Sequence, residues 1–94
     1  MDEPYSASTI KKLLRHILER GTLSFSRHAY LEMASDHLIE VDARNVLRGG
    51  TAGPGELVNH SWRYRVETNR IAVVIAFRTE DWAVVVTAWR KQIS

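Results

Sequence analysis

The chain has 94 residues, no cysteine and a formal net charge of +2. This length suffices for one small core, so we expect residues 1–94 to form a single domain. The lack of cysteine excludes disulfides and thiolate metal sites and suits a reducing compartment. No apolar run reaches the length of a membrane span, and the start MDEPYSAS lacks the pattern of a signal peptide. We therefore expect a cytoplasmic protein.

A first helix is predicted over residues 8–20, because Ile10 to Leu18 contain apolar residues at helical spacing. Ser8 is its expected N-cap, and Gly21 is expected to end it. The opposite face of this helix is basic and carries Lys11, Lys12, Arg15, His16 and Arg20. Such a face is either simply solvated or a surface for nucleic acid.

The next stretch, FSRHAYLEM, has the features of a helix N-terminus. Ser26 is the expected N-cap, with Phe25 and Tyr30 placed for a hydrophobic staple. Arg27 and His28 occupy the first turn, where the helix dipole disfavours cations. A bound anion would favour them there, since helix N-termini attract anions.

We expect this second helix to end at residue 35 or 37. A third, shorter helix is expected to begin at Asp42, with Val41 and Val46 as a staple, and to end at Gly49. The connector GGTAGPG follows it and lacks the lysine of a phosphate-binding loop. Beyond it the apolar period changes to two, which predicts strands near 56–60, 61–67, 71–78 and 82–90. Helices followed by an antiparallel meander predict an α+β fold with helices on one face of the sheet.

The expected turns fix how these strands pair. A turn at Thr68–Asn69 would pair Val66 with Ile71, and a turn at Glu80–Asp81 would pair Ile75 with Val86. One face is then apolar and forms the core. Its expected members are Trp62, Tyr64, Val66, Ile71, Val73, Ile75, Phe77, Val84, Val86 and Ala88.

The opposite face has small residues in its middle strand, with Arg63 and Arg65 on one side and Thr87 and Trp89 on the other. Strands lie about 4.8 Å apart, so these side chains would flank a trough roughly one nucleotide wide. Trp89 could stack a base while the arginines hold phosphate, as single-stranded RNA requires. The alternative is a solvated face with arginines lying along apolar surface. Ten of the thirteen cations are arginine, which suits phosphate but is also expected of a GC-rich genome.

The order FSRHAYLEM, VDARNVLRGG, a Gly/Pro connector and a meander ending in VVVTAWRK resembles the bacterial family named domain of unknown function 4258. That family is grouped with the RelE-, ParE- and MqsR-like toxins. The resemblance covers about residues 24–91 and implies helices packed on a curved antiparallel sheet. It also implies a metal-independent endoribonuclease or the toxin of a toxin–antitoxin pair. We therefore expect RNA, free or on the ribosome, and a cognate antitoxin as partners, and no cofactor.

Ser26, His28 and Met33 match the pattern of that family. Its Arg-Gly pair is replaced here by Asp36 and His37, a departure that bears on activity more than on fold. RNA cleavage without metal needs proton transfer and cations that stabilise the charged transition state.

Histidine can transfer protons near neutral pH, so His28 is the first catalytic candidate and His60 the second, with Arg65 stabilising the phosphate. The expected substrate-binding residues are Arg27, Arg63, Thr87 and Trp89. We expect no metal site, since the four histidines lack ligand spacing. A structural role for His28, with its ring bonded to a backbone carbonyl, stays open.

Two other functions also stay open. The domain could be a catalytically inactive module that binds RNA or a protein in the same trough. It could instead be an accessory protein whose sheet edge accepts a strand from another chain.

Overall fold

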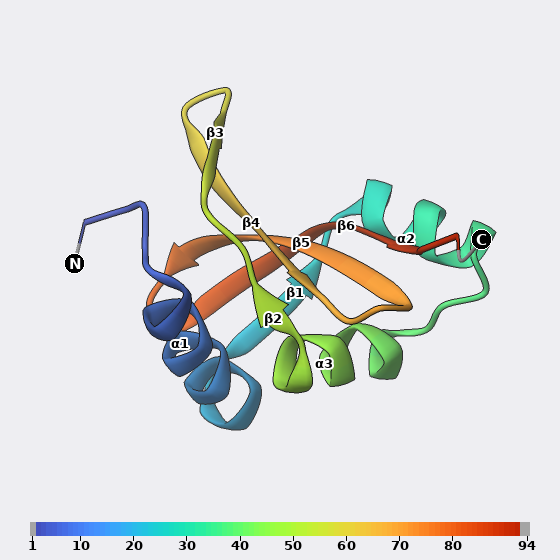
Figure 1. Cartoon of the computed structure of the whole chain (residues 1–94), viewed down its shortest axis with the longest axis horizontal. Coiled ribbons are helices and arrows are strands. Elements are labelled where there is room, and N and C mark those ends of the chain that lie inside the picture. The colour runs from blue at the N-terminus through green and yellow to red at the C-terminus, as the bar shows by residue number, and fades with distance from the viewer. Residues whose placement is uncertain (1, 93–94) are drawn as a thin grey trace.

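The computed structural model describes residues 2–92, which form three helices and six strands (Figure 1). The helices are α1 (Ala7–Arg20), α2 (Arg27–Ser35) and α3 (Glu40–Gly49). The strands are β1 (Thr22–Phe25), β2 (Thr51–Ala52), β3 (Glu56–Val58), β4 (Ser61–Glu67), β5 (Ile71–Thr79) and β6 (Trp82–Arg90). No helix within residues 2–92 has the length and apolar character needed to cross a membrane.

The start of α1 differs from the expected one. Ser6, not Ser8, is the N-cap, because the Ser6 hydroxyl accepts a hydrogen bond from the backbone N–H of Thr9 at 3.2 Å. Gly21 ends the helix as predicted. A side chain at Gly21 would overlap the backbone carbonyl of Asp81, so the close approach of the chain requires glycine there.

The start of α2 confirms the predicted cap. The Ser26 hydroxyl accepts a hydrogen bond from Ala29 N at 3.0 Å. The rings of Phe25 and Tyr30 stack with their centroids 5.5 Å apart. Local sequence alone therefore locates this helix start correctly.

The start of α3 was predicted too late. Ile39 is the N-cap, and Asp42 is the third helical residue, whose carboxylate accepts a hydrogen bond from Ile39 N at 2.8 Å. The expected staple is also absent from the structure, because Val41 is 57% exposed whereas Val46 is buried. Asp42 thus stabilises the helix start from within its first turn.

The sheet has the strand order β1-β6-β5-β4-β2, with β3 pairing to β4 (Figure 1). Its C-terminal part is the antiparallel meander β4-β5-β6, so the predicted α+β class is confirmed. The sheet is larger than the expected meander of about four strands, because β1 pairs with β6 in parallel and β2 adds a short edge. Strands of four and two residues are too short to show an alternating pattern.

The register differs from the prediction at two places. Val66 pairs with Val73 instead of Ile71, a shift of two residues that leaves every side chain on its expected face. In the next pair, the predicted partners Val74 and Thr87 are confirmed. A β-bulge then follows, so that Ile75 pairs with Val85 rather than with Val86.

This bulge changes which residues of β6 enter the core. Ala83 and Val85 belong to the core cluster. The predicted Val84 is buried but lies outside this cluster, and the predicted Val86 is half-buried. The extra residue lies on β6. It reverses which side chains of β6 face the core between the bulge and the start of the strand at Trp82. The other predicted core residues lie in or against the cluster, namely Trp62, Tyr64, Val66, Ile71, Val73, Ile75, Phe77 and Ala88.

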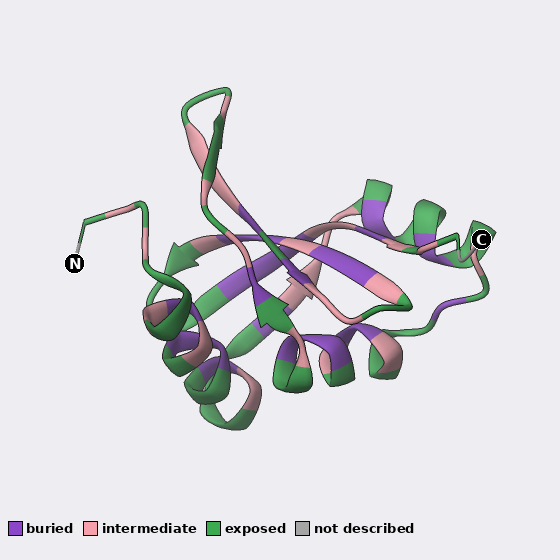
Figure 2. Ribbon diagram, viewed as in Figure 1, coloured by how far each residue is buried: buried purple, intermediate pink, exposed green. Residues whose placement is uncertain are grey.

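The helices supply the rest of this core. α1 and α3 pack together and against the sheet, burying Ile10, Leu14 and Leu47. α2 packs along β6 and adds Ala29 and Met33. Figure 2 shows the buried sides of the helices turned toward the sheet, while the far end of the β3–β4 hairpin is exposed.

The β3–β4 hairpin extends away from the rest of the sheet, because the pairing of β4 with β5 ends at Tyr64 and Ile75 (Figure 1). The Tyr5 ring packs beside this junction, 6.0 Å from the Tyr64 ring and 5.5 Å from that of Phe77. The Tyr64 hydroxyl accepts a hydrogen bond from Tyr5 N and donates one to Glu3 at 2.7 Å. Burial raises the pKa of Tyr64, and the Glu3 carboxylate raises it further.

Candidate nucleic-acid interface

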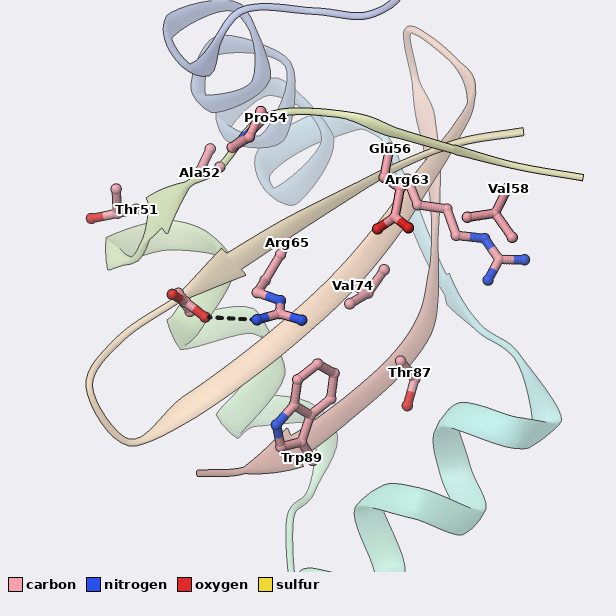
Figure 3. Close-up of a pocket in the computed structure, with 12 residues that line it drawn as sticks. Thr51, Ala52, Pro54, Glu56, Val58, Arg63, Arg65, Val74, Thr87 and Trp89 are labelled. Atoms are coloured by element: carbon pink, nitrogen blue, oxygen red, sulfur yellow. Dashed lines mark ion pairs between the residues drawn. The ribbon is translucent and has the colours of Figure 1, made fainter. Parts of the chain in front are cut away.

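A groove of about 630 Å³ lies on the face of the meander opposite the core (Figure 3). Arg65 on β4, Val74 on β5 and Thr87 on β6 are directly paired, so they form one row across it. Arg63 and Trp89 line the same groove. The trough expected from strand alternation is therefore present, with its four expected polar and aromatic residues.

The guanidinium of Arg65 lies over Trp89, with Cζ 5.1 Å from the ring centroid (Figure 3). Its Nη1 is also 3.9 Å from a Glu67 oxygen, and Lys91 Nζ is 3.2 Å from that same oxygen. The Arg65 side chain is 57% exposed, and cation–π contacts at exposed sites contribute only about 0.5–1 kcal/mol. A ligand can therefore displace Arg65 from the ring at small cost.

Arg63 has a buried polar atom that the rest of the chain does not satisfy. Its Nε has no hydrogen-bond partner among residues 2–92. Glu56 is its cross-strand neighbour and lines the same groove. Leaving a buried donor unpaired costs about 1–3 kcal/mol. Because this Nε is covered by the protein, an acceptor in the groove reaches it only when the Arg63 side chain turns.

Two glutamates, Glu56 and Glu67, line the groove and were missed by the sequence reasoning. Glu67 follows Arg63 and Arg65 at a spacing of two, so strand alternation could have placed it on this face. Glu56 depends on the pairing of β3 with β4, which was not predicted, although the start of β3 and both ends of β4 were. Lys91 offsets the charge of Glu67, which leaves the arginines and Glu56 as the main charges on the groove.

His60 does not line the groove. The expected strand 56–60 ends at Val58, and Asn59 and His60 form the turn of the hairpin with φ of 49° and 66°. Two consecutive residues of positive φ are typical of a type I′ turn. His60 is therefore exposed at the hairpin tip, and its expected place in a strand is wrong.

His28 lies in the first turn of α2 and also does not line the groove. Its side chain is 64% exposed, with Nε2 4.0 Å from a Glu32 oxygen. The neighbouring Ser26 hydroxyl donates a hydrogen bond to the carbonyl of Val86 at 2.9 Å. Val86 directly precedes Thr87, which lines the groove. The start of α2 therefore lies beside the side of the groove that β6 forms. Arg27 is exposed in the same turn.

The end of α2 contains the positions at which the family resemblance expects Arg-Gly. His37 has φ of 57°, a left-handed conformation that glycine adopts more readily than histidine. The Asp36 carboxylate accepts a hydrogen bond from Arg90 N at 2.7 Å. Asp36 thus ties the end of α2 to the end of β6.

Within residues 2–92, no three His, Asp or Glu side chains gather closely enough to hold a metal ion. Comparison with known proteins found no matching family model, curated protein or solved structure. A proposal of function therefore rests on the residues that line the groove and on the exposed imidazole of His28.

Proposed function

We propose that the protein binds single-stranded RNA in this groove and cleaves it without a metal ion, as a cytoplasmic toxin controlled by an antitoxin. The observation that carries the proposal is the row of Arg65 and Thr87 across Val74, with Arg63 and Trp89 in the same groove. Aromatic faces and guanidinium groups together are what sequence-tolerant binding of single strands requires.

Binding would exchange contacts within the protein for contacts with RNA. A base would stack on Trp89 in place of the Arg65 guanidinium, which lies there now. Arg65 would then be free to bind the adjacent phosphate. The Arg63 side chain would turn so that its Nε, buried and unpaired in the free protein, meets a phosphate oxygen.

Cleavage would use His28, because α2 begins beside the strand that carries Thr87 and Trp89. A phosphate that follows the base bound at Trp89 would approach the N-terminus of α2, which attracts anions. The exposed His28 ring would take the proton of the 2′-hydroxyl or protonate the leaving oxygen.

The second candidate is a binding module of the same fold without catalysis. It is favoured by one observation, that the groove is lined by neither His28 nor His60. Both candidates place RNA in the same groove, so the chemistry of the products distinguishes them.

The test is incubation of purified protein with unstructured RNA in EDTA. We expect fragments that end in cyclic phosphate, and a large loss of them for Arg65→Ala. Arg78→Ala, an exposed arginine outside the groove, is the matched control and should cleave normally. RNA that binds but stays intact would favour the binding module. RNA that neither binds nor breaks would contradict both candidates.

A further inference from the structure

A second cluster of cations lies between α1 and α3, on the side of the sheet opposite the groove. A cleft of about 190 Å³ there is lined by Lys11, Arg15, Glu19 and Arg48. Lys12 lies three residues before Arg15 and so shares its helix surface. We define Lys11, Lys12, Arg15 and Arg48 as the basic helical surface.

Charge is concentrated on this surface. With Glu19 it carries a net charge of +3, from four cations and one acid, whereas the whole chain carries +2. The remainder of the molecule is therefore slightly acidic. None of the four cations forms an ion pair with a carboxylate of residues 2–92.

One of these cations has a structural task. Lys11 Nζ donates hydrogen bonds to the carbonyls of Leu47 at 2.8 Å and Arg48 at 3.1 Å, near the C-terminus of α3. Cations are favourable at that end of a helix. These bonds explain why a lysine occupies position 11. They do not explain Lys12 and Arg15, whose exposed side chains form no hydrogen bond or ion pair within residues 2–92.

The cations also oppose one another. The pKa of Lys11 is lowered, first by burial and then by the positive charge of Arg15. Arg15 therefore adds repulsion to the cleft, where Glu19 is the one acid among the lining residues. An excess of positive charge that the lining acid does not neutralise is what attracts an anion to such a surface.

We propose that the basic helical surface binds phosphates of the RNA backbone that lie outside the groove, so that the protein engages long or folded RNA from two sides. This inference rests on the proposed function, since it takes RNA to be the ligand. Arginine and lysine on a helix contact phosphates without reading sequence. Because groove and surface lie on opposite sides of a sheet, a short strand in the groove does not reach both.

The test compares Arg15→Glu with Arg78→Glu, an exposed arginine outside both surfaces. The probes are a short oligouridylate, which fills only the groove, and a long structured RNA. We expect Arg15→Glu to weaken binding of the long RNA about tenfold at low salt and to lower the salt slope by about one. Its affinity for the short probe should equal that of wild type, and its melting temperature should not fall.

The outcomes separate this inference from the proposed function. Unchanged binding of the long RNA by Arg15→Glu overturns the inference and leaves the groove proposal standing. Equal weakening by Arg78→Glu overturns it too, because net charge alone would then explain the effect. If wild type binds neither RNA, both proposals fail, and binding of an acidic peptide would identify a protein partner instead.

Discussion

His28 is the residue on which the catalytic part of the account depends. Its side chain is 64% exposed, with Nε2 4.0 Å from a Glu32 oxygen. Ser26 already caps the helix, so the imidazole is not needed to begin it. No hydrogen bond from the ring to a backbone carbonyl is found within residues 2–92, which leaves the ring accessible to a ligand.

We expect His28→Ala to lower the RNA cleavage rate by a factor of about 100 to 10,000, the usual contribution of one proton-transfer group. The melting temperature should change little, because the ring is exposed. Both quantities are measured on the same preparation. An unchanged rate would remove His28 from the mechanism, whatever the melting temperature.

Tyr64 gives a prediction about alkaline pH. Its pKa in the folded state is raised above the usual 10.0 by burial, with a further increase from Glu3. Above pH 10 the unfolded chain releases this proton before the folded chain does, so the free energy of unfolding falls as pH rises. Tyr64→Phe should be about 1 kcal/mol less stable at neutral pH, through its lost hydrogen bonds, but should show a shallower alkaline decline. Denaturant titrations at several pH values measure this, and equal declines would contradict it.

At the scale of elements, the β-bulge in β6 decides which valines are buried. Val85 belongs to the core, whereas Val86, the extra residue, is only half-buried. Val85→Ala should therefore cost about 2 kcal/mol of unfolding free energy, and Val86→Ala clearly less. Urea denaturation of both variants tests this matched pair. A larger loss for Val86→Ala would show that β6 continues without a bulge.

The sequence predicts elements whose signal is local. Ser26 locates α2 because its cap and staple lie within five residues, and strand alternation places Arg65 and Trp89 on one face. The bulge after Val74 cannot be predicted in this way, because Val84, Val85 and Val86 are identical in type and suit either face. The parallel pairing of β1 depends on contacts with β6, some sixty residues later. The hairpin turn at His60 was missed because neither of its residues is glycine.

At the scale of the whole molecule, the sheet has two different faces. One carries the core and the helices, and the other carries the groove over β5 (Figures 1 and 3). Side chains of β4 and β5 contribute to both faces, because Tyr64 and Val73 point into the core while Arg65 and Val74 line the groove. The groove thus spans three paired strands, and their pairing sets the backbone spacing between Arg65 on β4 and Trp89 on β6.

The central claim is that Trp89 and its neighbouring arginines bind single-stranded RNA, and a titration of labelled oligouridylate by fluorescence anisotropy tests it most directly. The proteins compared are wild type, Trp89→Ala and Trp82→Ala, the last being an exposed tryptophan of the same strand outside the groove. We expect Trp89→Ala to lose about 1–3 kcal/mol of binding free energy, the contribution of one stacked base, while Trp82→Ala binds as wild type does. Wild-type affinity should also fall as salt rises. Equal affinities for Trp89→Ala and wild type, or an affinity that does not change with salt, would contradict the claim.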